Sequence, residues 1–156
     1  MSAPALIPFT RAVGTVRLAT EFLSAGLLQD MDAMPPSLVA HFLFGHAIEL
    51  AFKSVLIANG ISERDLRRLG HDLVATRNAA IVVAPAGLLD CDSGDIARLE
   101  LLSPYYQAKA LEYLAPGFMS LPLARELLAL TERLVASVAR YIDTHVRTEL
   151  AKGRSV

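Results

Sequence analysis

The chain has no tryptophan and a single cysteine, and only 6% of its 156 residues are aromatic. One cysteine, Cys91, excludes an intrachain disulfide and any metal site built from several thiolates. No run of about 18 apolar residues free of charge occurs, so we expect no membrane-spanning helix. The beginning of the chain, MSAPALIPFTRAVG, lacks the basic start, apolar core and small-residue cleavage site of a signal peptide. These absences favour a cytoplasmic protein.

Apolar side chains are what the sequence has in excess. Hydrophobic residues make up 53% of it, while the formal net charge is only −1. A chain of this length most simply forms one domain with a substantial core. Apolar surface beyond the needs of such a core favours a subunit interface, so we expect a homodimer. The near-neutral net charge argues against the strongly basic surface that many nucleic-acid-binding proteins carry.

Helical spacing dominates the sequence and no strand-like alternation is convincing, which predicts an all-α fold, a four- to five-helix bundle with a long C-terminal helix. Residues 1–8 are expected to be a flexible tail and residues 9–152 a single helical domain. Helices are expected at about 10–28 and 37–59, in a short piece within 61–69, from about 71 or 72 onward, from about 92 or 93 to 114, and at about 121–152.

The run DCDSGD places Asp90, Asp92 and Asp95 close together, as calcium-binding loops do. An EF-hand loop, however, requires glycine at its sixth position and glutamate at its twelfth, and this run has neither. We therefore expect Asp92 or Ser93 to cap the following helix. No metal site and no cofactor are expected, because no Walker loop, zinc-binding HExxH or dinucleotide-binding pattern occurs.

The second expected helix is apolar on nearly every face, which predicts a position in the middle of a bundle. Its polar exceptions are His46, Glu49 and Lys53, which lie within about 60° of one another around the helix. Glu49 precedes Lys53 by four residues, the favourable order for an ion pair. His71 and Asp72, at the start of a later helix, are their expected partners. Such a cluster is either a buried polar network that fixes helix packing, which we favour, or an anion- or nucleotide-binding pocket.

These residues also carry a resemblance. HAIELAFKSVL, followed by a short charged connection and GHDL, resembles the HEPN superfamily of small all-α domains. The similarity covers residues 38–75 best and extends loosely to YYQAKALEYLAPG and the last helix. The resemblance implies a HEPN-like, commonly dimeric bundle that either cleaves RNA or associates with a nucleotidyltransferase partner.

HEPN ribonucleases carry an Arg-x4–6-His motif in a late helix, and Arg140 and His145 have this spacing in ARYIDTH. By the resemblance, His145 would be the general base on an RNA 2′-hydroxyl and Arg140 would stabilise charge at the phosphate. A five-residue step, however, turns two side chains about 140° apart on a helix, so the pair would converge only in a dimer cleft. Tyr141 also stands where the family often has a polar residue.

Arg133, Arg140 and Arg147 recur every seven residues and therefore follow one stripe of the last helix. This basic ridge would bind phosphates, pair with acidic residues across an interface, or, as is commonest, face solvent.

The sequence predicts a non-catalytic or degenerate HEPN-like module that forms a homodimer and binds RNA or a partner protein, such as a nucleotidyltransferase. The alternative is a metal-independent endoribonuclease of the toxin–antitoxin or phage-defence type. Whether the protein is an enzyme stays open at this point.

Overall fold

The computed structural model describes residues 3–113 and 117–153, and all regular structure in this part of the chain is helical. The all-α class is confirmed, with six helices in the described part where four to five were expected. They are α1 (Ala3–Gly26), α2 (Leu38–Ala58), α3 (Glu63–Leu69), α4 (Leu73–Val83), α5 (Ser93–Gln107) and α6 (Ala124–Gly153).

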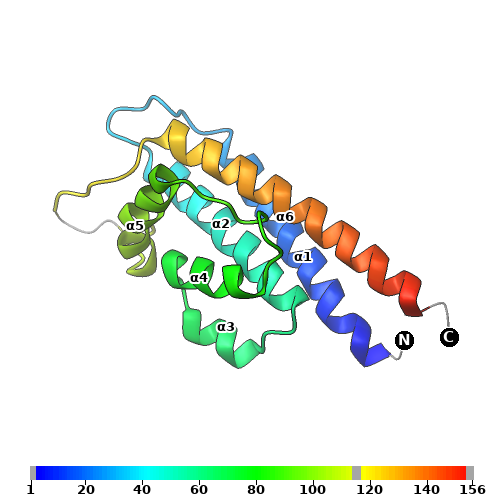
Figure 1. Ribbon diagram of the computed structural model, residues 1–156. Helices are drawn as coiled ribbons and strands as arrows, with labels where there is room; N and C mark the ends of the chain where they lie inside the picture. The colour runs from blue at the N-terminus through cyan, green and yellow to red at the C-terminus, as the bar shows by residue number, and fades with distance from the viewer. Residues whose placement is uncertain (1–2, 114–116, 154–156) are drawn as a thin grey trace.

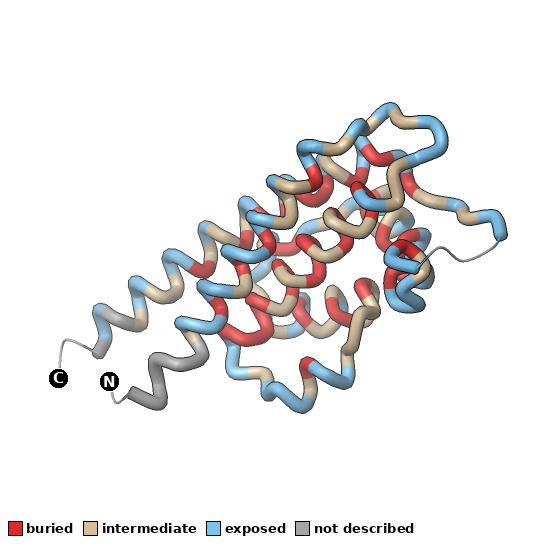
Figure 2. Tube along the Cα trace, turned by 180° about the vertical axis from the view of Figure 1, so that it is seen from behind, coloured by how far each residue is buried: buried red, intermediate tan, exposed pale blue. Residues whose placement is uncertain are grey.

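The helix α2 lies at the centre of the bundle and contacts α1, α4, α5 and α6 (Figure 1). Its largest buried side chains, Phe44, Ile48, Phe52 and Leu56, are four residues apart and form one continuous apolar row. Ala40 continues this row toward the start of the helix, and Ala47 and Ala51, outside the row, are also fully buried. Figure 2 shows buried residues along the whole of α2, whereas α1 and α6 are buried on one side only. The sequence pattern of a helix apolar all round therefore corresponds to a helix covered all round.

Four of the helices begin with a side chain that accepts a hydrogen bond from the first turn. Ser37 accepts from the Ala40 amide, Ser62 from the Asp65 amide, and Asp72 from the Ala75 amide. Asp92 and Asp95 form a reciprocal capping box at the start of α5. Each cap is worth about 0.5–2 kcal/mol. The helix starts expected near residues 72 and 92 are confirmed.

Two helix ends differ from the expected ones. The first helix begins at Ala3 rather than near Thr10, so residues 3–8 of the expected tail are helical, while residues 1 and 2 lie outside the described part of the chain. Pro4 lies in the first turn, where its missing N–H is not needed, and it does not prevent the helix from starting there. The helix α5 ends at Gln107, about seven residues early, because Lys109 adopts a φ of 58° and the Ala110 amide turns back to the Tyr105 carbonyl at 2.9 Å.

Within the described residues, α2 is the one helix long and apolar enough to cross a bilayer. Buried residues make up 72% of that apolar window, since the neighbouring helices cover it. Helices in the core of globular proteins are often as long and as apolar as α2, so length and composition alone are weak evidence for a membrane span.

Candidate functional site

Glu49, only 2% exposed, is the centre of a polar cluster in the interior. Its Oε1 accepts a hydrogen bond from Lys53 Nζ at 2.5 Å, and its Oε2 accepts one from the Tyr106 hydroxyl at 2.5 Å. His71 Nδ1 lies 3.1 Å from the same Oε2. Lys53 Nζ also donates to the Gly70 carbonyl oxygen at 2.8 Å. The cluster therefore joins the middle of α2 to α5 and to the turn between α3 and α4, and we call it the Glu49 cluster.

His46 completes the Glu49 cluster one turn before Glu49 along α2. Its Nδ1 lies 2.6 Å from the Tyr106 hydroxyl oxygen. Because that hydroxyl donates its own proton to Glu49, His46 Nδ1 is the donor here. The imidazole packs edge-on against the Phe22 ring, with centroids 4.3 Å apart, and stacks on Phe42 at 5.7 Å. Burial lowers the pKa of His46 more than the Glu49 charge raises it, so the ring is neutral at pH 7.

The electrostatics of the cluster favour an ionised Glu49. Burial raises the pKa of Glu49, but hydrogen bonds from Lys53, Tyr106 and His71 outweigh that effect and leave it below its ordinary value. Burial, together with the adjacent carboxylate, raises the pKa of Tyr106, so the phenol stays protonated. A buried ion pair is costly unless its remaining hydrogen-bonding groups are satisfied. Here the carboxylate has three donors, which is why the arrangement is tolerated.

The structure brings His46, Glu49, Lys53 and His71 together, but it places Asp72 elsewhere. The carboxylate of Asp72 caps α4 and accepts a second hydrogen bond from Ser103 Oγ at 3.2 Å. It therefore ties α4 to α5, and the expectation that it would partner Glu49 does not hold. The reason is geometric, since a residue in the capping position turns its side chain back toward the amides of its own helix.

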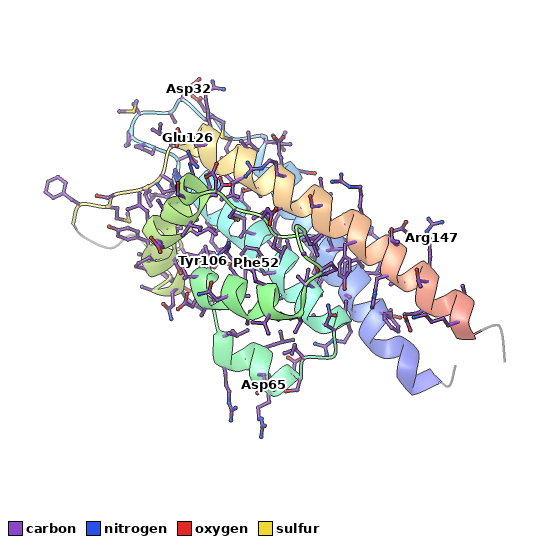
Figure 3. All side chains as sticks on the ribbon, in the orientation of Figure 1. Asp32, Phe52, Asp65, Tyr106, Glu126 and Arg147 are labelled. Carbon is purple, nitrogen blue, oxygen red and sulfur yellow. The ribbon has the colours of Figure 1, made fainter. Side chains whose placement is uncertain are left out.

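Tyr106 is the cluster member that the sequence did not reveal. It lies 57 residues from Glu49 along the chain. Tyr106 comes from α5, and its hydroxyl reaches the central helix at Glu49 (Figure 3). The adjacent tyrosines in the run SPYYQ attract notice, but their spacing on a helix equally fits ordinary core packing. No local pattern indicates which of the two hydroxyls reaches a buried carboxylate.

The Glu49 cluster borders a hollow of about 350 Å³ between α1, α2 and α3, which we call the α1–α3 hollow. Lys53 and His71 belong both to the cluster and to the wall of this hollow. Arg11 of α1 and Arg67 of α3 also line it, with the Glu63 carboxylate close to both. The remaining wall residues are Thr15, Leu50, Ile57, Leu66 and Gly70.

Arg140 and His145 have different surroundings within one protomer. Arg140 is exposed, donates to Ser137 Oγ at 3.3 Å, and lines a hollow of about 570 Å³ beside the loop that precedes α5. His145 packs instead against the rings of Phe9 in α1 and Tyr141, with centroids 5.6 and 5.4 Å away. In the described part of the chain the two side chains share no common partner. Their five-residue spacing accounts for this divergence.

Two members of the basic ridge are paired with carboxylates of their own chain. Arg133 pairs with the buried carboxylate of Asp95, and Arg147 Nε lies 2.9 Å from Asp143 Oδ2. Figure 3 shows Arg147 projecting away from the bundle. Arg140, the middle member, has no carboxylate within ion-pair distance among the described residues. The ridge is therefore a row of separate local contacts rather than a continuous cationic surface.

The aspartate-rich run before α5 has two structural roles. Asp92 and Asp95 cap the helix, and Asp95 also pairs with Arg133. No group of three metal-ligating side chains occurs among the residues that the structure describes.

Cys91 is half-buried in this region. Burial raises the pKa of its thiol more than the nearby Arg77 lowers it, so the thiol is protonated at pH 7. A protonated thiol is a weak nucleophile.

The end of the bundle away from both termini carries many exposed apolar side chains. Two loops lie there, residues 27–37 between α1 and α2 and residues 117–123 before α6 (Figures 1 and 2). Between them is a hollow of about 600 Å³, lined by Pro35, Pro36, Leu38, Met119, Ser120 and Leu121. The exposed large apolar residues of these loops and of the adjoining turn of α2 are Leu27, Leu28, Met34, Val39, Phe118 and Leu123. We call this surface the apolar end.

No family model, no curated protein and no solved structure matches the chain.

Proposed function

We propose that the chain is a cytoplasmic, HEPN-like helical module without catalytic activity, which forms a homodimer through its apolar end and so presents a partner-binding scaffold. The observation that carries the proposal is the exposure of the apolar end. Phe118 is fully exposed, at 106%, and Leu28 and Met34 are more than four-fifths exposed. Exposed apolar side chains that gather around a hollow are typical of protein–protein interfaces.

A second copy of the chain suits this surface because it offers both a projection and a recess. Phe118 stands out from the loop before α6, and the hollow of about 600 Å³ lies between that loop and the loop before α2. In a two-fold symmetric dimer the same patch of each subunit meets its counterpart, so a projection on one copy can enter the recess of the other. The paired charges of Asp32 and Arg125 lie beside the patch, where a polar rim is expected.

The HEPN-like part of the proposal is supported by how the two halves of the motif meet. The Glu-x-x-x-Lys half supplies Glu49 and Lys53, and the GHDL half supplies Gly70 and His71. Hydrogen bonds link both pairs, since Lys53 donates to the Gly70 carbonyl and His71 to the Glu49 carboxylate. The motif thus joins the central helix to the start of the next one. The absence of catalysis is supported by the different surroundings of Arg140 and His145.

The test is the molar mass in solution of the purified chain, measured by light scattering over a range of concentrations. We expect a dimer for the parent chain and a monomer for a Phe118→Ser, Leu123→Ser double variant. Val82→Ser is the matched control, because Val82 is equally apolar, 84% exposed and located on α4, outside the apolar end. A monomeric parent chain, or a double variant that stays dimeric, would contradict the proposal.

A further inference from the structure

The α1–α3 hollow gathers cationic side chains from three helices around one recess. Arg11 comes from α1, Lys53 from α2 and Arg67 from α3, and His71 follows α3 directly. Among the residues that the structure describes, the carboxylates that face these groups are Glu63 at the rim and Glu49 behind the wall. Three permanent positive charges therefore stand against two negative ones, on a molecule whose formal net charge is −1.

Two groups of the inner wall have hydrogen-bonding capacity left over. The Lys53 ammonium has three N–H donors and uses one on Glu49 and one on Gly70. His71 donates Nδ1–H to Glu49, and Nε2 has no partner among the described residues. Nε2 accepts a hydrogen bond from a phosphate hydroxyl when the ring is neutral and donates one to a phosphate oxygen when the ring is protonated. Both side chains are held in place by Glu49, so their free positions are fixed beside the hollow. His71 is 45% exposed and Lys53 18%, which leaves them accessible from that side.

The contacts of Glu63 show how the arginines of the hollow bind an anionic group. Its carboxylate pairs with Arg11 of α1, and Arg67 Nε lies 3.4 Å from its Oε1. These hydrogen bonds and charges, Arg11 first, hold the pKa of Glu63 below its ordinary value. The Glu63 side chain is 48% exposed, so water competes for it and an incoming anion can displace it.

We propose that the α1–α3 hollow binds the phosphate group of a small phosphate ester, with Lys53 and His71 on its inner side and Arg11 and Arg67 on its outer side. Arginine donates two parallel hydrogen bonds to phosphate oxygens, and lysine supplies a point charge. The apolar wall formed by Leu50, Ile57 and Leu66 adjoins these groups and would cover the organic part of the ester. This site is separate from the apolar end and does not depend on dimerisation.

The first experiment is an NMR titration of the full chain with inorganic phosphate at constant low ionic strength, which follows the ring signals of His71. The chain has only four histidines, so these signals can be assigned from their loss in a His71→Gln variant. We expect saturable shifts for the parent chain. In Arg67→Gln the affinity should fall about threefold to tenfold, since one exposed charged contact is lost.

Arg68→Gln is the matched control, because Arg68 lies next to Arg67 on α3, pairs with Asp65 and does not line the hollow. It should bind phosphate as the parent chain does. Glu63→Gln should change the affinity in the opposite direction, because it removes the carboxylate that competes with phosphate for the two arginines. No saturable shift in the parent chain, or equal affinities in Arg67→Gln and Arg68→Gln, would overturn the proposal.

The source of the phosphate is distinguished by a parallel titration with adenosine monophosphate. Tighter binding than inorganic phosphate assigns the hollow to an organic ester, whereas tighter binding of inorganic phosphate would overturn that part of the proposal. Lys53 is tested last, because Lys53→Gln also removes a partner of buried Glu49. The unfolding midpoint of this variant is therefore measured first and compared with that of the parent chain.

Discussion

Glu49 carries a charge in a part of the molecule that water does not reach, and three side chains hold it there. In Glu49→Gln, Lys53 loses the carboxylate that compensates its charge, which for a buried pair costs about 3 kcal/mol of unfolding free energy. In a Glu49→Gln, Lys53→Met double variant no uncompensated charge is left, so we expect a smaller loss than in either single variant. Denaturant unfolding midpoints compare the variants. Equal midpoints for the singles and the double would show that the pair does not act as a unit.

The lowered pKa of Glu49 makes stability depend on pH in a definite direction. The folded chain holds this carboxyl ionised to lower pH than the unfolded chain does, so its contribution is complete above the ordinary pKa of 4.5 and is lost as pH falls through the folded value. We therefore expect the stability difference between the parent chain and Glu49→Gln to shrink as pH falls below 4.5. Urea unfolding at a series of pH values measures it.

Glu100→Gln serves as the control for this pH dependence, because Glu100 is an exposed glutamate on α5. Its stability difference from the parent chain should be small at every pH. A Glu49→Gln difference that stays constant down to the acid transition would contradict the assignment of the pH dependence to Glu49.

At the scale of single residues, the sequence reveals the polar side chains on an apolar helix but not the partners that they contact from distant parts of the chain. His46, Glu49 and Lys53 stand out because nearly everything around them in the second helix is apolar. His71 lies close in the chain, next to a glycine that ends a helix. Tyr106 could not be predicted, because its hydrogen bond depends on how α5 packs against α2, which no spacing within either segment determines.

At the scale of helices, the most extensive contact in the bundle is between α1 and α2, and it includes the end of α1. A Cβ atom on Gly26 would lie 2.4 Å from the Phe44 ring, a fully buried side chain of α2. Gly26→Ala therefore forces the helices apart or moves Phe44, at a cost of about 1–3 kcal/mol. Thermal or urea unfolding of this variant tests how closely the helices approach.

Gly14→Ala is the contrasting change in the same helix. A Cβ atom on Gly14 meets nothing within 4 Å, so only the backbone preference changes. Alanine should stabilise the helix there by up to about 1 kcal/mol. A Gly26→Ala variant that is as stable as Gly14→Ala would rule out the tight contact with Phe44.

Helix interiors were easier to predict than helix ends. The apolar row of α2 and the capping side chains Asp72 and Asp92 indicated where those helices lie. The start of α1 was missed because prolines near a chain end resemble a tail, although a proline in a first turn is compatible with a helix. The end of α5 was missed because the left-handed turn at Lys109 involves neither glycine nor asparagine, the residues that usually mark it.

At the scale of the whole molecule, the different surroundings of Arg140 and His145 have a direct experimental consequence. We expect the purified chain to leave single-stranded RNA intact in the presence of EDTA. A His145→Ala variant, compared at matched stability, should give the same result as the parent chain. Cleavage by the parent chain that is lost in His145→Ala would instead establish a metal-independent ribonuclease and make Arg140 the next residue to replace.

The helical class and the central helix of the bundle could be predicted because they follow from apolar periodicity over many residues. The apolar end could be anticipated only as a general excess of hydrophobic residues, since its members come from two loops about 90 residues apart in the sequence. Loops lack the regular spacing that makes helices recognisable, so their meeting point depends on the assembled bundle.

The first and last helices begin and end side by side, as the contact between Phe9 and His145 at 5.6 Å shows, and they do so at the opposite extreme from the apolar end (Figure 1). A fluorescent protein or an affinity tag fused at either terminus therefore stays clear of the apolar end. The same proximity allows a short linker to join the two helices directly. The chain could then be reopened in the loop between α4 and α5, giving a circular permutant with the same bundle and different ends.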